Sequence, residues 1–314
     1  MRTRFYLTAA ILVLALFTVA GCGSPPATPA FSPLQAAREQ TPSESVPLKG
    51  KRELLYASAP RTNSVFVFAY PQGALVQEID GLDDPTGVCV DSNGHVWITN
   101  ADNGRGNGYL VEYAHGGSDP IAVLQDPHNA PQACSVDFIT GDLAVANAPV
   151  GNGANIAIFS NAQGAPKYYP TPGLAQGVVG ITYGAFSNIY FADAKGHTAW
   201  LPAGGRRVMK FLLTPNPRAD GPIQWDGLEL AVLTSVRHEN QIWRYAIKGN
   251  SGERGGIVKL KGVDKANGFA IYHSGLAASS SLGVWLFDYP VGGPSTYLIK
   301  QALGVTAVAI SVAK

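Results

Sequence analysis

A turn built on glycine recurs six times along the chain at an almost constant interval. Its glycines are 43, 48, 40, 45 and 43 residues apart. They are Gly73, Gly116, Gly164, Gly204, Gly249 and Gly292. Glycine suits such a turn because a tight hairpin needs a positive φ angle. A period in the forties with several short strands per unit is typical of propeller blades, and it disfavours a sandwich or a solenoid.

The second unit shows the strands of one repeat most clearly, and we name them a, b, c and d in chain order. They are expected at residues 88–90, 96–99, 109–113 and 121–124. Later units are expected over residues 134–169, 177–213, 222–261 and 267–301. Strand b of the last unit is poorly marked, because its alanines and serines at 277–281 have little apolar surface to bury.

The first unit lacks strand a, and we expect the missing strand at the other end of the chain. Strands b, c and d are expected at residues 54–58, 65–68 and 75–79. Residues 305–312 form an apolar stretch that has no partner of its own. Pairing this stretch with the first unit removes two open sheet edges. The predicted fold class is therefore all-β: a six-bladed β-propeller whose first blade is closed by one C-terminal and three N-terminal strands.

The segment before the repeats is typical of an exported protein. Arg2 and Arg4 precede an apolar run over residues 5–20, which is the pattern of a secretory signal. The run is shorter than the roughly 20 apolar residues of a membrane-spanning helix. It ends in the sequence VAGC, which resembles the lipobox of bacterial lipoproteins, so we expect lipidation at Cys22.

Three regions follow from this interpretation. Residues 1–21 are the predicted signal peptide, residues 22–52 carry the lipidated Cys22 and a disordered proline-rich tether, and residues 53–314 form the propeller. We expect the protein in the cell envelope, outside the cytoplasm, on the outer membrane or on its periplasmic or surface side. Lipid chains on Cys22 would make the membrane its first partner.

The charge balance argues against a nucleic-acid partner. Removal of residues 1–21 leaves 23 − 2 = 21 basic residues against 22 acidic ones, a net charge near −1. Charged residues make up only 14% of the chain, below the roughly 25% of an ordinary soluble domain. No basic patch is implied by these numbers.

The segment PTGVCVDSNGHVWITN, residues 85–100, resembles an NHL-type repeat. The resemblance extends from about residue 54 to the C-terminus, and it is strongest in the second and third units. It implies the propeller fold more firmly than a function, because proteins with such repeats include binding proteins, scaffolds and several enzymes.

We expect a ligand at the face that carries the d-to-a and b-to-c loops, because the longer loops gather there. The candidate ligand-binding residues are Asn100, Arg105, His128, Asn147, Asp193, Arg237, His238, Glu239 and Asn267. A solvated polar rim, or side chains that cap turns, would account for the same residues. On the opposite face, Asp91, Asp137 and Asp226 are interpreted as turn residues.

No catalytic constellation is recognised. His238 and Glu239 are adjacent, and neighbours along a strand point to opposite sides. The histidines lack metal-ligand spacing, and no nucleophile motif, phosphate-binding glycine loop or zinc signature occurs. Gluconolactonase-type propellers hold a divalent metal with a carboxylate in the closing blade. Residues 305–310 contain no acid, so we expect no metal and no cofactor.

The leading hypothesis for function is a monomeric, non-enzymatic binding or interaction platform anchored to the membrane. Its ligand would be an unidentified protein or small molecule at the loop face. The alternative is a metal-dependent, lactonase-like hydrolase that resembles gluconolactonase-type propellers. A purely structural component of the envelope is a third possibility.

Two cysteines lie on strands a of adjacent units, on sheet faces that meet. Cys89 and Cys134 can form a disulfide in an exported protein. Sheets packed face to face are about 10 Å apart, whereas a disulfide prefers a Cα separation of about 5.5 Å. The spacing therefore favours buried free thiols, with the disulfide as the alternative.

Overall fold

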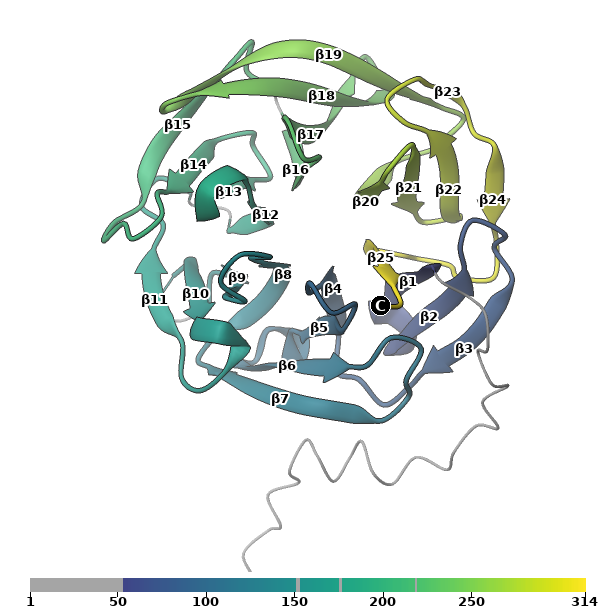
Figure 1. The fold of residues 1–314 in the computed structure, drawn as a ribbon, viewed down its shortest axis with the longest axis horizontal. Helices are drawn as coiled ribbons and strands as arrows, with labels where there is room; N and C mark the ends of the chain where they lie inside the picture. Colours follow the sequence, from purple (N-terminus) through teal and green to yellow (C-terminus); the bar gives the residue numbers. More distant parts are fainter. Residues whose placement is uncertain (1–52, 151–152, 175–176, 218) are drawn as a thin grey trace, which may run out of the picture. The chain divides into compact units, whose positions relative to one another are not determined.

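The computed structural model describes residues 53–150, 153–174, 177–217 and 219–314 (Figure 1). The predicted signal peptide, Cys22 and the tether lie outside these residues. Among the described residues the helices are three-residue 3-10 turns, and none is long and apolar enough to span a membrane. The rest of the regular structure is β-strand, as predicted.

Four sheets have four antiparallel strands each. The first contains β25 (Ala307–Val312), β1 (Glu53–Ala59), β2 (Ser64–Ala69) and β3 (Leu75–Ile79). The second contains β4 (Pro85–Val90), β5 (Val96–Asn100), β6 (Asn107–Tyr113) and β7 (Pro120–Pro127). The third contains β8 (Ala130–Val136), β9 (Leu143–Ala148), β10 (Asn155–Phe159) and β11 (Lys167–Pro170). The fourth contains β20 (Ala266–Tyr272), β21 (Gly275–Ser280), β22 (Gly283–Asp288) and β24 (Tyr297–Ile299).

The remaining strands form one sheet of nine strands instead of two separate blades. One part contains β12 (Val178–Tyr183), β13 (Ile189–Asp193), β14 (Thr198–Leu201) and β15 (Met209–Thr214). The other contains β16 (Ala219–Trp225), β17 (Leu230–Val236), β18 (Glu239–Lys248) and β19 (Ser251–Lys261), with β23 (Gly292–Pro294) beside β19.

The length of β19 explains why the nine strands join. β19 has 11 residues, and its outer edge leaves backbone groups without a partner in its own hairpin. The parallel strand β15 pairs with one end of this edge, over Leu212–Thr214, and β23 pairs with the other. The fourth and fifth predicted units are therefore joined in one sheet, whereas the antiparallel order within each part is as expected.

The sheets surround a common centre, with β4, β8, β12, β16, β20 and β25 innermost (Figure 1). The arrangement is that of a β-propeller. The first sheet joins the two ends of the described chain, because Glu53 pairs with Val312 and Ser58 with Ala307. The predicted pairing of one C-terminal strand with three N-terminal strands is therefore present.

Buried side chains fill the spaces between neighbouring sheets. In β1 every residue after Glu53 is buried, because this second strand of its sheet is covered on both sides. β21 shows why its strand was poorly marked in the sequence. Ala277, Ala278 and Ser279 are fully buried, so small side chains here reflect close packing against neighbouring sheets rather than a surface position.

A buried carboxylate connects the nine-stranded sheet to the fourth sheet. Asp226 follows β16, and its Oδ1 accepts hydrogen bonds from the backbone N–H groups of Leu228 and Glu229. Its Oδ2 accepts from Arg244 Nε at 2.9 Å and from the hydroxyl of Tyr289 at 2.5 Å. Burial alone would raise the pKa of Asp226, but these hydrogen bonds favour the charged form and lower the pKa below its ordinary value.

We expect Asp226→Asn to lower the free energy of unfolding by about 1–3 kcal/mol at pH 7, because an amide cannot accept all of these bonds. A carboxyl with a lowered pKa stabilises the fold above the unfolded-state pKa of about 3.9, and this stabilisation is lost as the pH falls through the folded-state pKa. The cost of the substitution should therefore shrink below about pH 4. Urea unfolding at pH 7 and pH 3.5 measures both effects. The exposed Asp119→Asn serves as the control, and an equal cost for both variants would contradict the prediction.

Candidate functional site

The innermost strands enclose a central channel with a cavity at each end. We call one end the turn face, because it carries the short turns at residues 91–95, 137–142, 184–188 and 226–229. The opposite end is the loop face. The loop-face cavity has a volume of about 390 Å³, and the turn-face cavity has a volume of about 800 Å³. The larger cavity therefore lies away from the face on which we expected the ligand.

Polar side chains in the loop-face cavity connect the innermost strands to one another. The amide of Asn267 donates to the carbonyl of Val305 at 3.0 Å. Thr306 donates to the carbonyl of Thr86 at 3.0 Å, and Thr86 donates to the carbonyl of Pro131 at 2.7 Å. None of the described residues that line this cavity carries a carboxylate. The described lining therefore offers amide, hydroxyl and backbone oxygens but no carboxylate for a hard divalent cation.

Two of the predicted ligand-binding residues act as buried caps of the backbone. Asn100 accepts a hydrogen bond from the N–H of Asp83 at 3.1 Å. Asp193 accepts from the N–H groups of Lys195 and His197, both at 2.9 Å. Its other oxygen lies 2.8 Å from Nδ1 of His197. The contacts of Asn100 and Asp193 are therefore those of side chains that cap turns, the alternative to ligand binding given by the sequence.

Five of the nine predicted residues are exposed at the loop face. The side chain of Arg105 is 3.5 Å from Asp102, while His128 is exposed next to β8. Arg237 and His238 are also exposed, in the turn between β17 and β18, and so is Glu239, the first residue of β18. Of the nine predicted residues, Asn267 is the one that lines either of these two cavities. The structure therefore does not bring the nine together into one site.

Asn147 belongs to a buried network that the sequence did not indicate. The carboxylate of Asp126 is fully buried and accepts hydrogen bonds from Asn129 at 2.8 Å, Asn147 at 2.9 Å and the hydroxyl of Tyr168 at 2.9 Å. Burial raises the pKa of Asp126 above its ordinary value, and the hydrogen bonds oppose this shift. The hydrogen-bond partners of Asp126 lie 3, 21 and 42 residues away in the sequence, so no local sequence pattern predicts the network.

The turn-face cavity has mainly apolar walls. Ile181, Tyr183, Trp225 and Ile271 lie in it, and burial raises the pKa of Tyr183 well above its usual range. Three further apolar side chains at its rim are those of Phe138, Ile139 and Phe186. Sequence reasoning missed this site, although large apolar residues at turn positions were a usable signal.

The aspartates of the turn face cap their own turns, as interpreted from the sequence. Asp91 accepts hydrogen bonds from the N–H groups of Asn93 and His95. Asp137 accepts from the N–H of Ile139 at 3.0 Å and from the hydroxyl of Thr140 at 2.9 Å. These carboxylates are therefore occupied in holding the turns that surround the cavity.

Among the described residues, one group of side chains has the spacing that could hold a metal ion. Ligand atoms of Asp91, His95 and Glu112 lie within 4.8 Å of one another. His95 Nδ1 is 3.0 Å from Glu112 and 3.7 Å from Asp91, so the three also form an ordinary ion-pair cluster. The sequence did not show this group, because Glu112 comes from β6 whereas the other two belong to the turn after β4.

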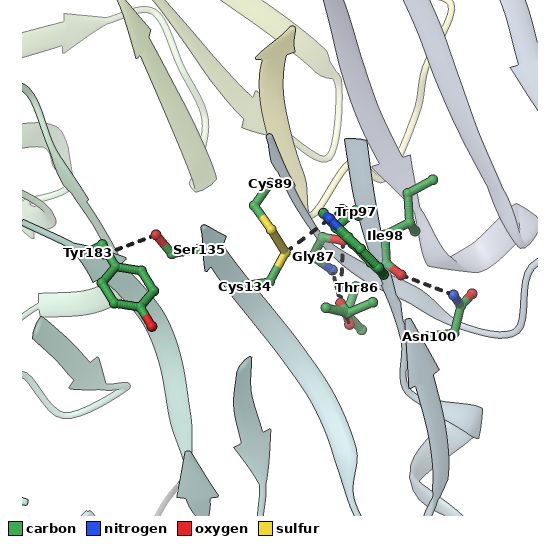
Figure 2. The surroundings of a disulfide bond; sticks show 10 residues. Thr86, Gly87, Cys89, Trp97, Ile98, Asn100, Cys134, Ser135 and Tyr183 are labelled. Carbon is green, nitrogen blue, oxygen red and sulfur yellow. Dashed lines mark hydrogen bonds between the residues drawn. A yellow bond between two sulfur atoms is a disulfide. The ribbon is translucent and has the colours of Figure 1, made fainter. Parts of the chain in front are cut away.

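Cys89 and Cys134 form a disulfide, so the expectation of free thiols is wrong (Figure 2). Their Cα atoms are 5.6 Å apart. The 10 Å spacing of stacked sheets does not apply at the centre of a propeller, because the innermost strands converge there. A Cβ atom on Gly87 would lie 2.7 Å from the carbonyl oxygen of Gln132 and 2.8 Å from the Cα of Ala133, which shows how closely β4 approaches β8.

The disulfide is part of the channel wall. Cys134 lines both cavities and Cys89 lines the turn-face cavity. Beside it, Ser135 of β8 accepts a hydrogen bond from the N–H of Tyr183 at 2.9 Å (Figure 2). These contacts connect three consecutive innermost strands at the level of the turn-face cavity.

The fold and the channel define this protein as a β-propeller. The NHL repeat family matches residues 82–105. A protein of unknown function from Bacteroides caccae is similar in structure, with 11% identity, a TM-score of 0.60 and coverage of 83% of this chain and 99% of that one. A functionally unknown protein from Desulfotomaculum acetoxidans has 14% identity, a TM-score of 0.55 and the same coverages.

A third similar structure is virginiamycin B lyase from Staphylococcus aureus, with 16% identity and a TM-score of 0.50. The similarity covers 71% of this chain and 72% of that one. No curated protein matches the chain. At these identities the likeness concerns the fold alone, because one propeller architecture supports many unrelated activities.

Proposed function

We propose that this protein is a lipid-anchored propeller of the cell envelope that serves as a binding platform for an apolar ligand. The observation that carries the proposal is the turn-face cavity of about 800 Å³ with its largely apolar walls. Small-molecule sites are commonly concave, mostly apolar and about 300–1,000 Å³ in volume.

Six blades are part of the proposal. Each part of the nine-stranded sheet repeats the antiparallel order of the four separate sheets, and β15 and β19 pair over three residues at the outer edge. Counting the parts as two blades gives six. Such a ring is a rigid frame around the channel, which suits a preformed binding site.

The location outside the cytoplasm is supported by two observations. Disulfides persist in oxidising compartments, and Cys89 is bonded to Cys134. The N-terminal sequence has the pattern of a signal followed by a lipobox at Cys22. We propose the lipid on Cys22 as the membrane anchor, and a monomer as the working unit.

The lactonase-like hydrolase has weaker support. Its metal site would lie in the channel at the loop face, where the described lining residues include no carboxylate. The loop-face residues nominated from the sequence stay candidates for contact with a partner protein, as an exposed polar surface around the channel.

The neutral apolar dye Nile red tests whether the turn-face cavity binds apolar molecules. We expect its fluorescence to rise on binding to the full-length protein, and Ala185→Trp to weaken binding roughly tenfold, because Ala185 lies in the cavity wall and the indole would fill its mouth. Ala203→Trp is the matched control, since Ala203 is exposed in a turn of the same sheet and lies outside the cavity wall. Equal affinities of the two variants would contradict the proposed site.

A further inference from the structure

Large apolar side chains stand exposed at the tips of three consecutive turns on the turn face. Phe138 and Ile139, between β8 and β9, are 69% and 74% exposed. Phe186, between β12 and β13, is 83% exposed, and Leu228, between β16 and β17, is 80% exposed. Single exposed apolar residues are common, but a cluster around one cavity marks an interaction surface.

The turn that carries Phe186 has a backbone conformation that does not favour phenylalanine. Phe186 and Ser187 both have a φ angle of 59°, in the left-handed region. Glycine and asparagine adopt this region readily, whereas a bulky side chain is rare there. Neither turn chemistry nor burial therefore accounts for a phenylalanine at this position.

Two arginines accompany the apolar tips. Arg206 and Arg207 lie in the turn between β14 and β15, and both are exposed. This turn is on the turn face, because the N–H of Ala203 donates to Asn188 in the neighbouring turn. Neither arginine forms an ion pair with any residue in the described part of the chain. Exposed arginines beside apolar tips are suited to an anionic lipid surface.

The described chain begins on the same face. Glu53 pairs with Val312 at the end of β25, and Ser311 of that strand donates a hydrogen bond to the carbonyl of Gly94 in the turn after β4. Cys22 lies 53 − 22 = 31 residues before Glu53. A tether from a lipid on Cys22 would thus join the propeller at its turn face, which is the face that carries the apolar tips.

We propose that the turn face docks on an anionic phospholipid surface. Phe138, Ile139, Phe186 and Leu228 enter the boundary between headgroups and acyl chains, while Arg206 and Arg207 contact lipid phosphates. The docking rests on the proposed lipid anchor for its orientation. In this position the turn-face cavity opens towards the membrane, so the ligand class is an amphiphile that reaches the cavity from the bilayer.

The test uses the full-length protein in vesicles of phosphatidylcholine and phosphatidylglycerol, with an environment-sensitive dye on one introduced cysteine. With the dye on Phe186→Cys we expect its emission to shift to the blue when vesicles are added. We expect a roughly twofold loss of that emission when the acyl chains of the lipids carry spin labels. The matched control is Leu303→Cys, because Leu303 is 60% exposed in the loop-face connection between β24 and β25. Its emission should not change. The same response at both positions would overturn the proposal.

A charge reversal tests the lipid contact independently of the dye position. We expect Arg206→Glu with Arg207→Glu to abolish most of the quenching at position 186 in vesicles with phosphatidylglycerol. The control Lys265→Glu changes an exposed charge on the loop face and should have no effect. Quenching that is unchanged by the double substitution would remove the anionic lipid from the proposal.

Flotation with the vesicles separates this inference from the lipid anchor. If the protein floats with the vesicles but the dye at position 186 is not quenched, the docking is overturned and the anchor is not. If the protein neither floats nor shows quenching, the anchor is overturned as well. Incorporation of radiolabelled palmitate into the protein in cells tests the anchor directly. Quenching at position 186 in a protein that takes up no palmitate supports the docking and contradicts the anchor. A blue shift without vesicles, together with a doubled mass in light scattering, would assign the surface to a second copy of the chain and overturn the docking.

Discussion

Deletion of residues 307–314 is expected to abolish folding, because it removes β25, the innermost strand of the first sheet. β1 would lose the partner with which it pairs from Glu53 to Ser58, and its buried side chains would meet water. An exposed apolar strand edge of this length favours aggregation. We expect the truncated protein to be insoluble rather than slightly less stable, as measured by soluble yield and circular dichroism.

A shorter deletion provides the matched control for ring closure. Ala313 and Lys314 follow β25 and are exposed, so their removal should leave solubility and the melting temperature unchanged. A soluble protein without residues 307–314, with a native circular dichroism spectrum, would show that closure by the C-terminal strand is not needed for the fold.

Loss of the disulfide should lower the free energy of unfolding by about 2–4 kcal/mol, which corresponds to a fall of roughly 5–10 °C in melting temperature. Cys89 and Cys134 are 45 residues apart in the sequence, so the bond closes a long loop in the unfolded chain. The bond also joins β4 to β8 at the channel wall. The variant with Cys89→Ala and Cys134→Ala tests this expectation by thermal unfolding.

Reduction with dithiothreitol is the complementary measurement. It should lower the melting temperature of the wild type but leave that of the double variant unchanged, because the variant has no bond to reduce. Wild-type unfolding that is insensitive to the reductant at concentrations that release both thiols would show that the bond adds no stability.

The regular spacing of the glycine turns and the short apolar strands between them were sufficient to predict an all-β propeller. These signals are local, since strand pairing between neighbours in the sequence depends on patterns a few residues long. The closing strand was also predictable, because residues 305–312 had no local partner and the first unit lacked one strand. The joining of two units through β15 and β19 was not predictable, because it depends on where the outer edges of two neighbouring sheets meet.

Part of the candidate site has a structural role that the capping alternative describes. The sequence pointed to polar residues of the loops, and the structure shows Asn100 and Asp193 engaged in caps. The anchor at Cys22 and ligand contacts at the loop face stay predictions. The apolar turn tips were not predicted as a site. Turns are ordinarily polar, so a single apolar residue in a turn does not indicate a surface until the structure shows which other apolar residues lie near it.

The sequence by itself determined the all-β class, the order of the units and the closure of the first sheet, because each depends on residues close together in the chain or on one unpaired strand. Tertiary structure alone decided that Cys89 meets Cys134, that Asp126 is enclosed by three donors, and that the larger cavity opens at the turn face. The physical reason is that the innermost strands of all the sheets converge on one centre. Innermost strands approach one another far more closely than stacked sheets do, and that distance is a property of the whole ring.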